Sequence, residues 1–149
     1  MIGVADTLFE LYGQIVVPAA VHAELTNASS PAALRFWVQD HRDQISVREV
    51  ILPEDPGLRC LDPGEAQAIF LAQQTPYSLL IIDERDGRAE ARRRGINITG
   101  LLGVIRDGAI RGYLDFEDTL EKLKETDFRL SSKTEAIVRE QYRNSRARE

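Results

Sequence analysis

Apolar residues recur at two spacings along this chain of 149 residues, and the spacing separates predicted helices from predicted strands. Apolar positions three or four apart predict helices, whereas short runs rich in β-branched residues predict strands. The predicted helices span residues 4–12, 18–25, 31–40, 62–72, 84–94 and 101–110, and the chain after Asp115 is helical. The predicted strands span residues 14–17, 45–52, 79–82 and 96–98, with a loop at 53–57.

Residues 61–103 show the clearest order of elements. The run from Leu79 to Ile82 is continuously apolar, as in a parallel strand that is buried on both faces. A charged helix, closed by Gly95, and a second short strand follow after short connections, which predicts a βαβ crossover. We therefore expect one α/β domain over residues 1–149, with a short parallel, Rossmann-like sheet flanked by helices and with a helical C-terminus.

The composition of the chain indicates its cellular compartment and the charge of its surface. The chain carries one cysteine, Cys60, has no apolar run of about 20 residues and lacks a basic segment at its N-terminus. We therefore expect a cytoplasmic protein that does not enter a membrane. The net charge of −5 argues against a whole surface that binds polyanions. Two groups of arginines could form local basic patches or solvated helix faces: Arg85, Arg88, Arg92, Arg93 and Arg94, and Arg139, Arg143, Arg146 and Arg148.

Three carboxylates are the candidate site residues. Asp83 follows a predicted strand, Glu65 lies in the first turn of the helix before that strand, and Glu24 lies in the helix after the strand at 14–17. Binding sites in open α/β sheets form beyond the carboxyl ends of the strands, so the three should share one edge. Carboxylates without His or Cys partners suit Mg²⁺ or Mn²⁺. Such an ion lowers the pKa of a bound water and neutralises a phosphate, as phosphodiester hydrolysis requires.

Each carboxylate also has a purely structural interpretation. Asp62, Pro63 and Glu65 form a capping box, in which Glu65 would only satisfy the start of its helix. Glu24 could be a solvated helical residue, and Asp83 could cap the helix that begins near Glu84. The residue pattern alone leaves these alternatives open.

Several sequence blocks together resemble a known family. IVVPAAVHAEL, LDPGEAQAIFLA, LLIIDERDGRAEAR and INITGLLGVI are similar, in this order, to the DUF3368 branch of PIN-domain proteins, over residues 2–131. The resemblance implies a metal-dependent ribonuclease, and many such proteins are the toxin half of prokaryotic toxin–antitoxin pairs. Matched position by position, the acidic site of the family falls on Glu24, Glu65 and Asp83. Arg85 or Arg88 would contact the phosphate of an RNA substrate.

One feature of the family has no match among these blocks. Similar PIN domains begin with a strand that ends in an aspartate and lies in the middle of the sheet, and the matched blocks begin after it. The Asp6–Thr7 pair is a weak substitute, because it falls within the predicted helix. Without this strand the sheet would have a gap with unpaired backbone groups, which a dimer, strand exchange or a partner could satisfy.

Two functional hypotheses follow from the sequence. In the first, the protein is a Mg²⁺- or Mn²⁺-dependent ribonuclease of toxin type, with Glu24, Glu65 and Asp83 as metal ligands and catalytic residues. In the second, it is a PIN-like module without catalysis, which binds an antitoxin protein or forms a homodimer. The loss of one carboxylate ligand motivates the second hypothesis, because hard cations need several oxygen ligands. A phosphate site at the Gly100–Gly103 turn is a weaker third alternative.

Overall fold

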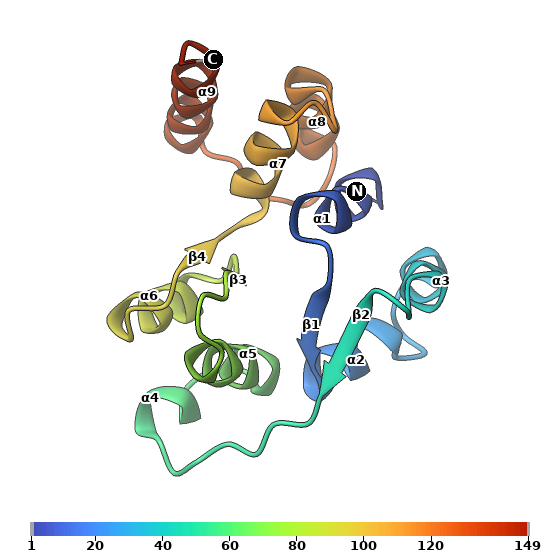
Figure 1. Ribbon diagram of the computed structural model, residues 1–149, viewed down its shortest axis with the longest axis vertical. Helices are drawn as coiled ribbons and strands as arrows, with labels where there is room; N and C mark the ends of the chain where they lie inside the picture. The colour runs from blue at the N-terminus through green and yellow to red at the C-terminus, as the bar shows by residue number, and fades with distance from the viewer. Residues whose placement is uncertain (1, 149) are drawn as a thin grey trace. The chain divides into compact units, whose positions relative to one another are not determined.

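A computed structural model describes residues 2–148, which form helices and short parallel strands (Figure 1). The elements are α1 (Ile2–Tyr12), β1 (Ile15–Pro18), α2 (Ala19–Thr26), α3 (Ala32–Asp40), β2 (Ile45–Arg48), α4 (Pro56–Arg59), α5 (Pro63–Gln74), β3 (Leu80–Ile81), α6 (Arg85–Arg93), β4 (Ile98–Thr99), α7 (Leu101–Ile110), α8 (Phe116–Lys124) and α9 (Ser132–Arg146). These elements divide into two compact units. The α/β unit runs from Gln14 to Gly100, and the helical unit joins the residues up to Gly13 with those from Leu101 onward.

The strands of the α/β unit form two parallel pairs. β1 pairs with β2 in the register Ile15↔Ile45, and β3 pairs with β4 in the register Leu80↔Ile98. α6 connects β3 to β4, so the predicted βαβ crossover is confirmed. Within the described residues the two pairs are separate sheets, with no hydrogen-bonded ladder joining them. The parallel α/β architecture is as expected, and the predicted gap in the sheet is present.

Helix α5 links the two sheets, because it packs against both β1 and β3. Ile69 on α5 is fully buried and shares a core with Ala91 of α6. Leu80 and Ile82 belong to the same core, and we call residues 80–83, which comprise β3 and the two residues after it, the β3 segment. Leu58 of α4 belongs to this core as well. The start of α5 is therefore held in place by packing on several sides.

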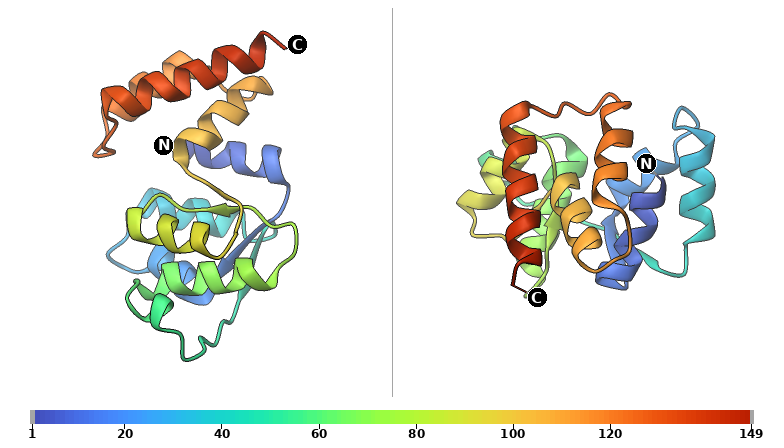
Figure 2. Two further views of the ribbon diagram at one scale, coloured as in Figure 1. Left: turned by 90° about the vertical axis from the view of Figure 1, so that its left-hand side faces the viewer. Right: turned by 90° about the horizontal axis from the view of Figure 1, so that it is seen from above.

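The helical unit is organised around α7, which contacts α1, α8 and α9 (Figure 2). Its core contains Ile105, Leu120 and Leu123, all completely buried. Gly108 lets α1 approach closely, since a methyl group there would come within 2.6 Å of Cγ2 of Thr7. The expectation of a single domain stays a prediction, because two compact units can belong to one domain or to two.

The ends of the helices follow the local sequence signals. Gly13 adopts a φ of +73° just after α1, and Ser131 caps α9 by accepting the N–H of Thr134 at 3.1 Å. The predicted loop at 53–57 is partly wrong, because Asp55 caps the short helix α4 by accepting the N–H of Gly57 at 3.0 Å. Asp55 and Pro56 thus repeat the Asp–Pro signal of Asp62 and Pro63.

Three of the predicted strands are longer than the observed ones, whereas the strand predicted at 14–17 is observed with the same length at Ile15–Pro18. The strand predicted over 45–52 ends at Arg48, because its partner β1 ends opposite it at Pro18, which has no N–H to continue the ladder. The strand predicted at 79–82 keeps only Leu80–Ile81, and the strand predicted at 96–98 is observed two residues later, at Ile98–Thr99. Between residues 2 and 148, no helix combines the length and apolar character that a membrane span needs.

Candidate functional site

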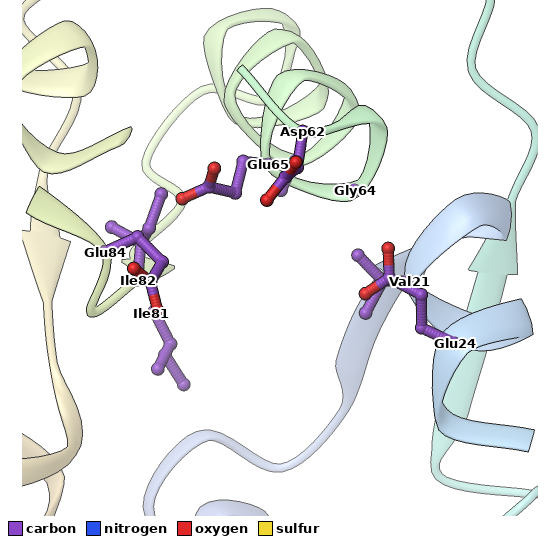
Figure 3. A pocket seen from close by; sticks show the side chains of 9 residues that line it. Val21, Glu24, Asp62, Gly64, Glu65, Ile81, Ile82 and Glu84 are labelled. Atoms are coloured by element: carbon purple, nitrogen blue, oxygen red, sulfur yellow. The ribbon is translucent and has the colours of Figure 1, made fainter. Parts of the chain in front are cut away.

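An open cavity of about 300 Å³ lies in the α/β unit, where α2, the start of α5 and the end of β3 meet (Figure 3). Small and apolar side chains form part of its wall, and four carboxylates line it. The lining residues are Val21, Glu24, Asp62, Gly64, Glu65, Ala68, Ile81, Ile82 and Glu84. Two of the three predicted site residues, Glu24 and Glu65, therefore lie at one cavity.

The carboxyl group of Glu65 is partly enclosed by neighbouring residues. Its Oε1 atom is buried and has no hydrogen-bond partner among the described residues. Gly87 and Ile82 lie against it: a methyl group at Gly87 would come within 2.8 Å of this oxygen and 2.6 Å of Cδ1 of Ile82. An unpartnered buried carboxylate oxygen is costly, so the arrangement favours either a proton or a cation there.

Burial is the largest cause that raises the pKa of the Glu65 carboxyl above its ordinary value. The neighbouring carboxylates of Asp62, Glu84 and Asp86 raise this pKa further, whereas a hydrogen bond from the backbone N–H of Asp62 lowers it. That hydrogen bond is one half of the predicted capping box. The other half is absent, because the side chain of Asp62 makes no capping hydrogen bond.

Glu24 reaches the cavity from α2, which follows β1 directly. The backbone N–H of Ala20 donates to Oε1 of Gln67 at 3.3 Å and ties α2 to α5. Oε1 of Glu24 lies near the start of α5, since a methyl group at Gly64 would come within 3.1 Å of it. Both β1 and α2 contact α5. The exposed side chain of Glu24, on α2, therefore lies across the cavity from Glu65, as Figure 3 shows.

Asp83 lies at the end of the β3 segment, as predicted, but is not among the residues that line the cavity. Its Oδ1 lies beside Gly100, where a methyl group would come within 2.5 Å of Oδ1 and 2.9 Å of Nη1 of Arg88. Over residues 2–148, no three Asp, Glu, His or Cys side chains gather closely enough to hold one metal ion.

The two predicted substrate residues begin α6. Arg85 is its first residue and is exposed. The half-buried Arg88 donates from Nη1 to the carbonyl oxygen of Ile82 at 2.7 Å, so part of its guanidinium supports the end of the β3 segment. Neither arginine lines the cavity, and their contact with a phosphate stays a prediction.

Sequence reasoning did not identify two of the cavity carboxylates. Asp62 was expected only as a helix cap, and Glu84 only as the start of the next helix. Their positions in the sequence could have indicated them, because Asp62 lies three residues before Glu65 and Glu84 directly follows Asp83. Residues adjacent to a strand end or a helix start share the edge on which the site forms.

The predicted basic groups are partly neutralised within the chain. The side chain of Arg94 is only 8% exposed and binds the carboxylates of Asp55 at 2.8 Å and Glu90 at 2.6 Å. In the helical unit, Arg139 binds the carboxylates of Glu117 and Glu135. These pairs neutralise one arginine in each of the two groups, and whether the remaining arginines form basic patches stays a prediction.

Comparison with known proteins identifies a family. The family model described as "DUF3368: PIN domain" matches residues 1–143, which is nearly the whole chain. No curated protein and no solved structure matches the chain significantly.

Proposed function

The chain belongs to the DUF3368 family of PIN domains, and from this premise we propose that it is a divalent-metal-dependent ribonuclease of toxin type. PIN domains have a nuclease-like fold, and they generally use divalent metals and act on RNA. The observation that carries the proposal is the buried Oε1 of Glu65, which has no described hydrogen-bond partner and lies at a cavity shared with Glu24. A cation would supply the missing partner.

The donor atoms of this region fit a hard cation. Among the described residues that line the cavity, the charged side chains are all carboxylates, and oxygen donors are the ligands that Mg²⁺ and Mn²⁺ prefer. Glu24 and Glu65 would hold the ion from opposite walls, and Asp83, at the end of the β3 segment, is the proposed third ligand. The type of donor atom fits the ion, although no three Asp, Glu, His or Cys side chains among the described residues lie close enough together to hold one.

A divalent ion at this position supplies an activated water and neutralises charge on a phosphate. The chain's own residues would position the reactants. Glu65 would face the cation with its buried Oε1 atom, which has no hydrogen-bond partner among the described residues. Arg88 braces the end of the β3 segment through its hydrogen bond to Ile82, and Arg85 is exposed beside it and able to contact an RNA phosphate.

Calorimetric titration with Mn²⁺ and cleavage of a fluorogenic single-stranded RNA test this proposal together. We expect saturable Mn²⁺ binding and Mn²⁺-dependent cleavage by the unmodified chain. Glu65→Gln should lose most of both, by about 100-fold or more in cleavage. Glu10→Gln, on the exposed face of α1 in the helical unit, is the matched control and should behave like the unmodified chain. Absence of both Mn²⁺ binding and cleavage would refute the proposal.

A second candidate function is a PIN-like binding module without catalysis. It is favoured by the lack of three clustered metal-ligating side chains within residues 2–148. In this case an antitoxin protein or a second copy of the chain, as a homodimer, would be the partner. Sedimentation of the purified chain without Mn²⁺ would detect the homodimer. A cytoplasmic location belongs to both proposals, because RNA and antitoxins are found there.

A further inference from the structure

Two adjacent residues of α6 lie beside two of the proposed metal ligands. A methyl group at Gly87 would come within 2.8 Å of Oε1 of Glu65. The next residue, Arg88, donates from Nη1 to the carbonyl oxygen of Ile82 at 2.7 Å. That carbonyl belongs to the peptide unit that joins Ile82 to Asp83. The first turn of α6 therefore contacts Glu65 directly and reaches Asp83 through its backbone.

The backbone on both sides of Ile82 is held in place. The N–H of Ile82 donates to the carbonyl oxygen of Thr99 at 2.9 Å, and the carbonyl oxygen of Ile82 accepts from Arg88. β3 itself ends at Ile81, one residue before this position. Because peptide units are planar, fixing the two units that flank Ile82 fixes the direction in which the chain enters Asp83. Arg88 supplies one of these two fixed points.

Gly100, which directly follows β4, leaves the room that this arrangement needs. A methyl group at Gly100 would come within 2.5 Å of Oδ1 of Asp83 and within 2.9 Å of Nη1 of Arg88. Both distances are shorter than ordinary van der Waals contact. The carboxylate of Asp83 and the guanidinium of Arg88 therefore lie side by side against the backbone of Gly100.

The two arginines at the start of α6 differ in their surroundings. Arg85 is exposed at the first position of the helix. Arg88 is half-buried, and one of its terminal nitrogens bonds the backbone. Polar groups that leave the solvent are held by hydrogen bonds within the chain, and this guanidinium is held by the residue before Asp83. Arg88 is therefore placed to act on Asp83.

We propose that Arg88 is a positioning residue for Asp83 and does not contact the RNA phosphate. Its hydrogen bond to Ile82 fixes the backbone from which the Asp83 carboxylate would reach a divalent ion, and Gly100 leaves the space for both side chains. Groups that orient a metal ligand from behind it typically change metal affinity or activity by about 10–100-fold when they are removed. This inference rests on the ribonuclease proposal, in which Asp83 is the third ligand.

Arg88→Met tests this role, because methionine keeps an unbranched stem and removes every donor. Three measurements are made: Mn²⁺ affinity by calorimetry, kcat and KM of Mn²⁺-dependent RNA cleavage, and affinity for the same RNA by anisotropy in EDTA. We expect Mn²⁺ affinity and kcat to fall by about tenfold or more. KM and RNA affinity should stay within about twofold of the unmodified chain. A residue that only contacted phosphate would show the reverse pattern.

Arg93→Met is the matched control, because Arg93 lies on the same helix and its side chain, which binds Glu90, is 65% exposed. It should leave all these quantities within about twofold. Arg88→Lys keeps the charge on a shorter stem, should fall between Arg88→Met and the unmodified chain, and carries the comparison if Arg88→Met does not fold. Unchanged Mn²⁺ affinity in both Arg88 variants would overturn the positioning role, and cleavage by the unmodified chain would still support the ribonuclease proposal.

A measurement without metal separates the two proposals. In EDTA, exchange of the Ile82 amide hydrogen, followed by NMR, should be about tenfold faster in Arg88→Met than in Arg93→Met. The reason is that the hydrogen bond from Ile82 to Thr99 opens more often when the carbonyl of Ile82 is no longer held. Equal exchange rates would overturn the positioning role whether or not the chain cleaves RNA. Absence of Mn²⁺ binding and cleavage in the unmodified chain refutes the ribonuclease proposal instead, whatever the exchange rate.

Discussion

Oε1 of Glu65 lies against the backbone of Gly87, so closely that a methyl group at position 87 would come within 2.8 Å of it. This contact joins the first turn of α5 to the first turn of α6. Gly87 is buried, and Cδ1 of Ile82 closes the same space from the β3 segment. The absence of a side chain at position 87 leaves room for Oε1 of Glu65, the oxygen that has no hydrogen-bond partner among the described residues.

Gly87→Ala should therefore disturb the site from a residue that is not a candidate ligand. We expect a loss of about 1–3 kcal/mol in the free energy of unfolding, because the added methyl group must displace Ile82 or Glu65. Urea denaturation followed by circular dichroism measures this loss. Ala89→Ser, on the exposed face of the same helix, should change stability by less than about 0.5 kcal/mol. Equal stability of the two variants would contradict the close contact.

Glu65 should make the stability of the fold decrease as the pH rises. Because burial raises the pKa of its carboxyl in the folded state, the folded chain holds this proton more tightly than the unfolded chain. The contribution of the Glu65 carboxyl to the free energy of unfolding is fully present below the ordinary glutamate pKa of about 4.3. It is lost as the pH rises through the raised pKa of the folded state. The effect is modest, because the side chain is only half-buried.

Glu65→Gln removes this titration. Relative to the unmodified chain, the variant should gain stability between about pH 4 and neutral pH, where the glutamate becomes charged. Urea denaturation of both proteins across this range, in EDTA, measures the difference. A difference that does not change with pH would show that the carboxyl is not desolvated.

Asp55 should have the opposite pH dependence. A hydrogen bond from the Arg94 guanidinium is the largest cause that lowers the pKa of this carboxyl. The stability that it contributes is present above the ordinary aspartate pKa of about 3.9 and is lost as the pH falls through the lowered folded pKa. Asp55→Asn keeps a residue able to cap α4 but removes the charge beside Arg94.

We expect Asp55→Asn to be less stable than the unmodified chain near neutral pH, and the difference to close near pH 2, a value about two units below the ordinary pKa. Thermal unfolding at both pH values measures it. Glu54→Gln, whose carboxylate pairs with Arg59 at the exposed surface, is the control and should show no measurable change. A similar loss in both variants would mean that burial of Arg94 does not strengthen its pair with Asp55.

Gly108 should be intolerant of a side chain where α7 meets α1. Gly108→Ala places a methyl group within 2.6 Å of Cγ2 of Thr7, whereas Gly3→Ala meets nothing within 4 Å. We expect Gly108→Ala to lower the free energy of unfolding by about 1–3 kcal/mol. Gly3→Ala should leave it unchanged or raise it by up to about 1 kcal/mol through helix propensity. Unfolding in urea distinguishes the two outcomes.

The sequence predicted the helices better than the strands, for a physical reason. Helix ends depend on nearby residues, such as Gly13 after α1 and Ser131 before α9. Strand ends depend on a distant partner, so nothing near Arg48 indicated that β2 ends where Pro18 ends β1. The gap between the two sheets was predicted, but from family resemblance rather than from any local pattern.

The candidate site was predicted in part. The rule for parallel strands placed Glu24 and Glu65 at one edge, and they line one cavity. The position of Asp83 beside Gly100 depends on how the chain turns after β3 and could not be predicted from spacing. The burial of Glu65 also escaped prediction, because it requires Gly87, a residue 22 positions further along, to pack against it.

The helical unit is built from two stretches of sequence, one before and one after the residues of the α/β unit. Val4 of α1 packs in the same core as Ile105 of α7 and Leu120 of α8. During synthesis on the ribosome α1 emerges before the α/β unit, whereas its packing partners emerge after that unit. The α/β unit is continuous in sequence, so all of its residues are synthesised before the packing partners of α1. A ribosome that stops before residue 101 therefore leaves α1 with none of the partners that bury its apolar face.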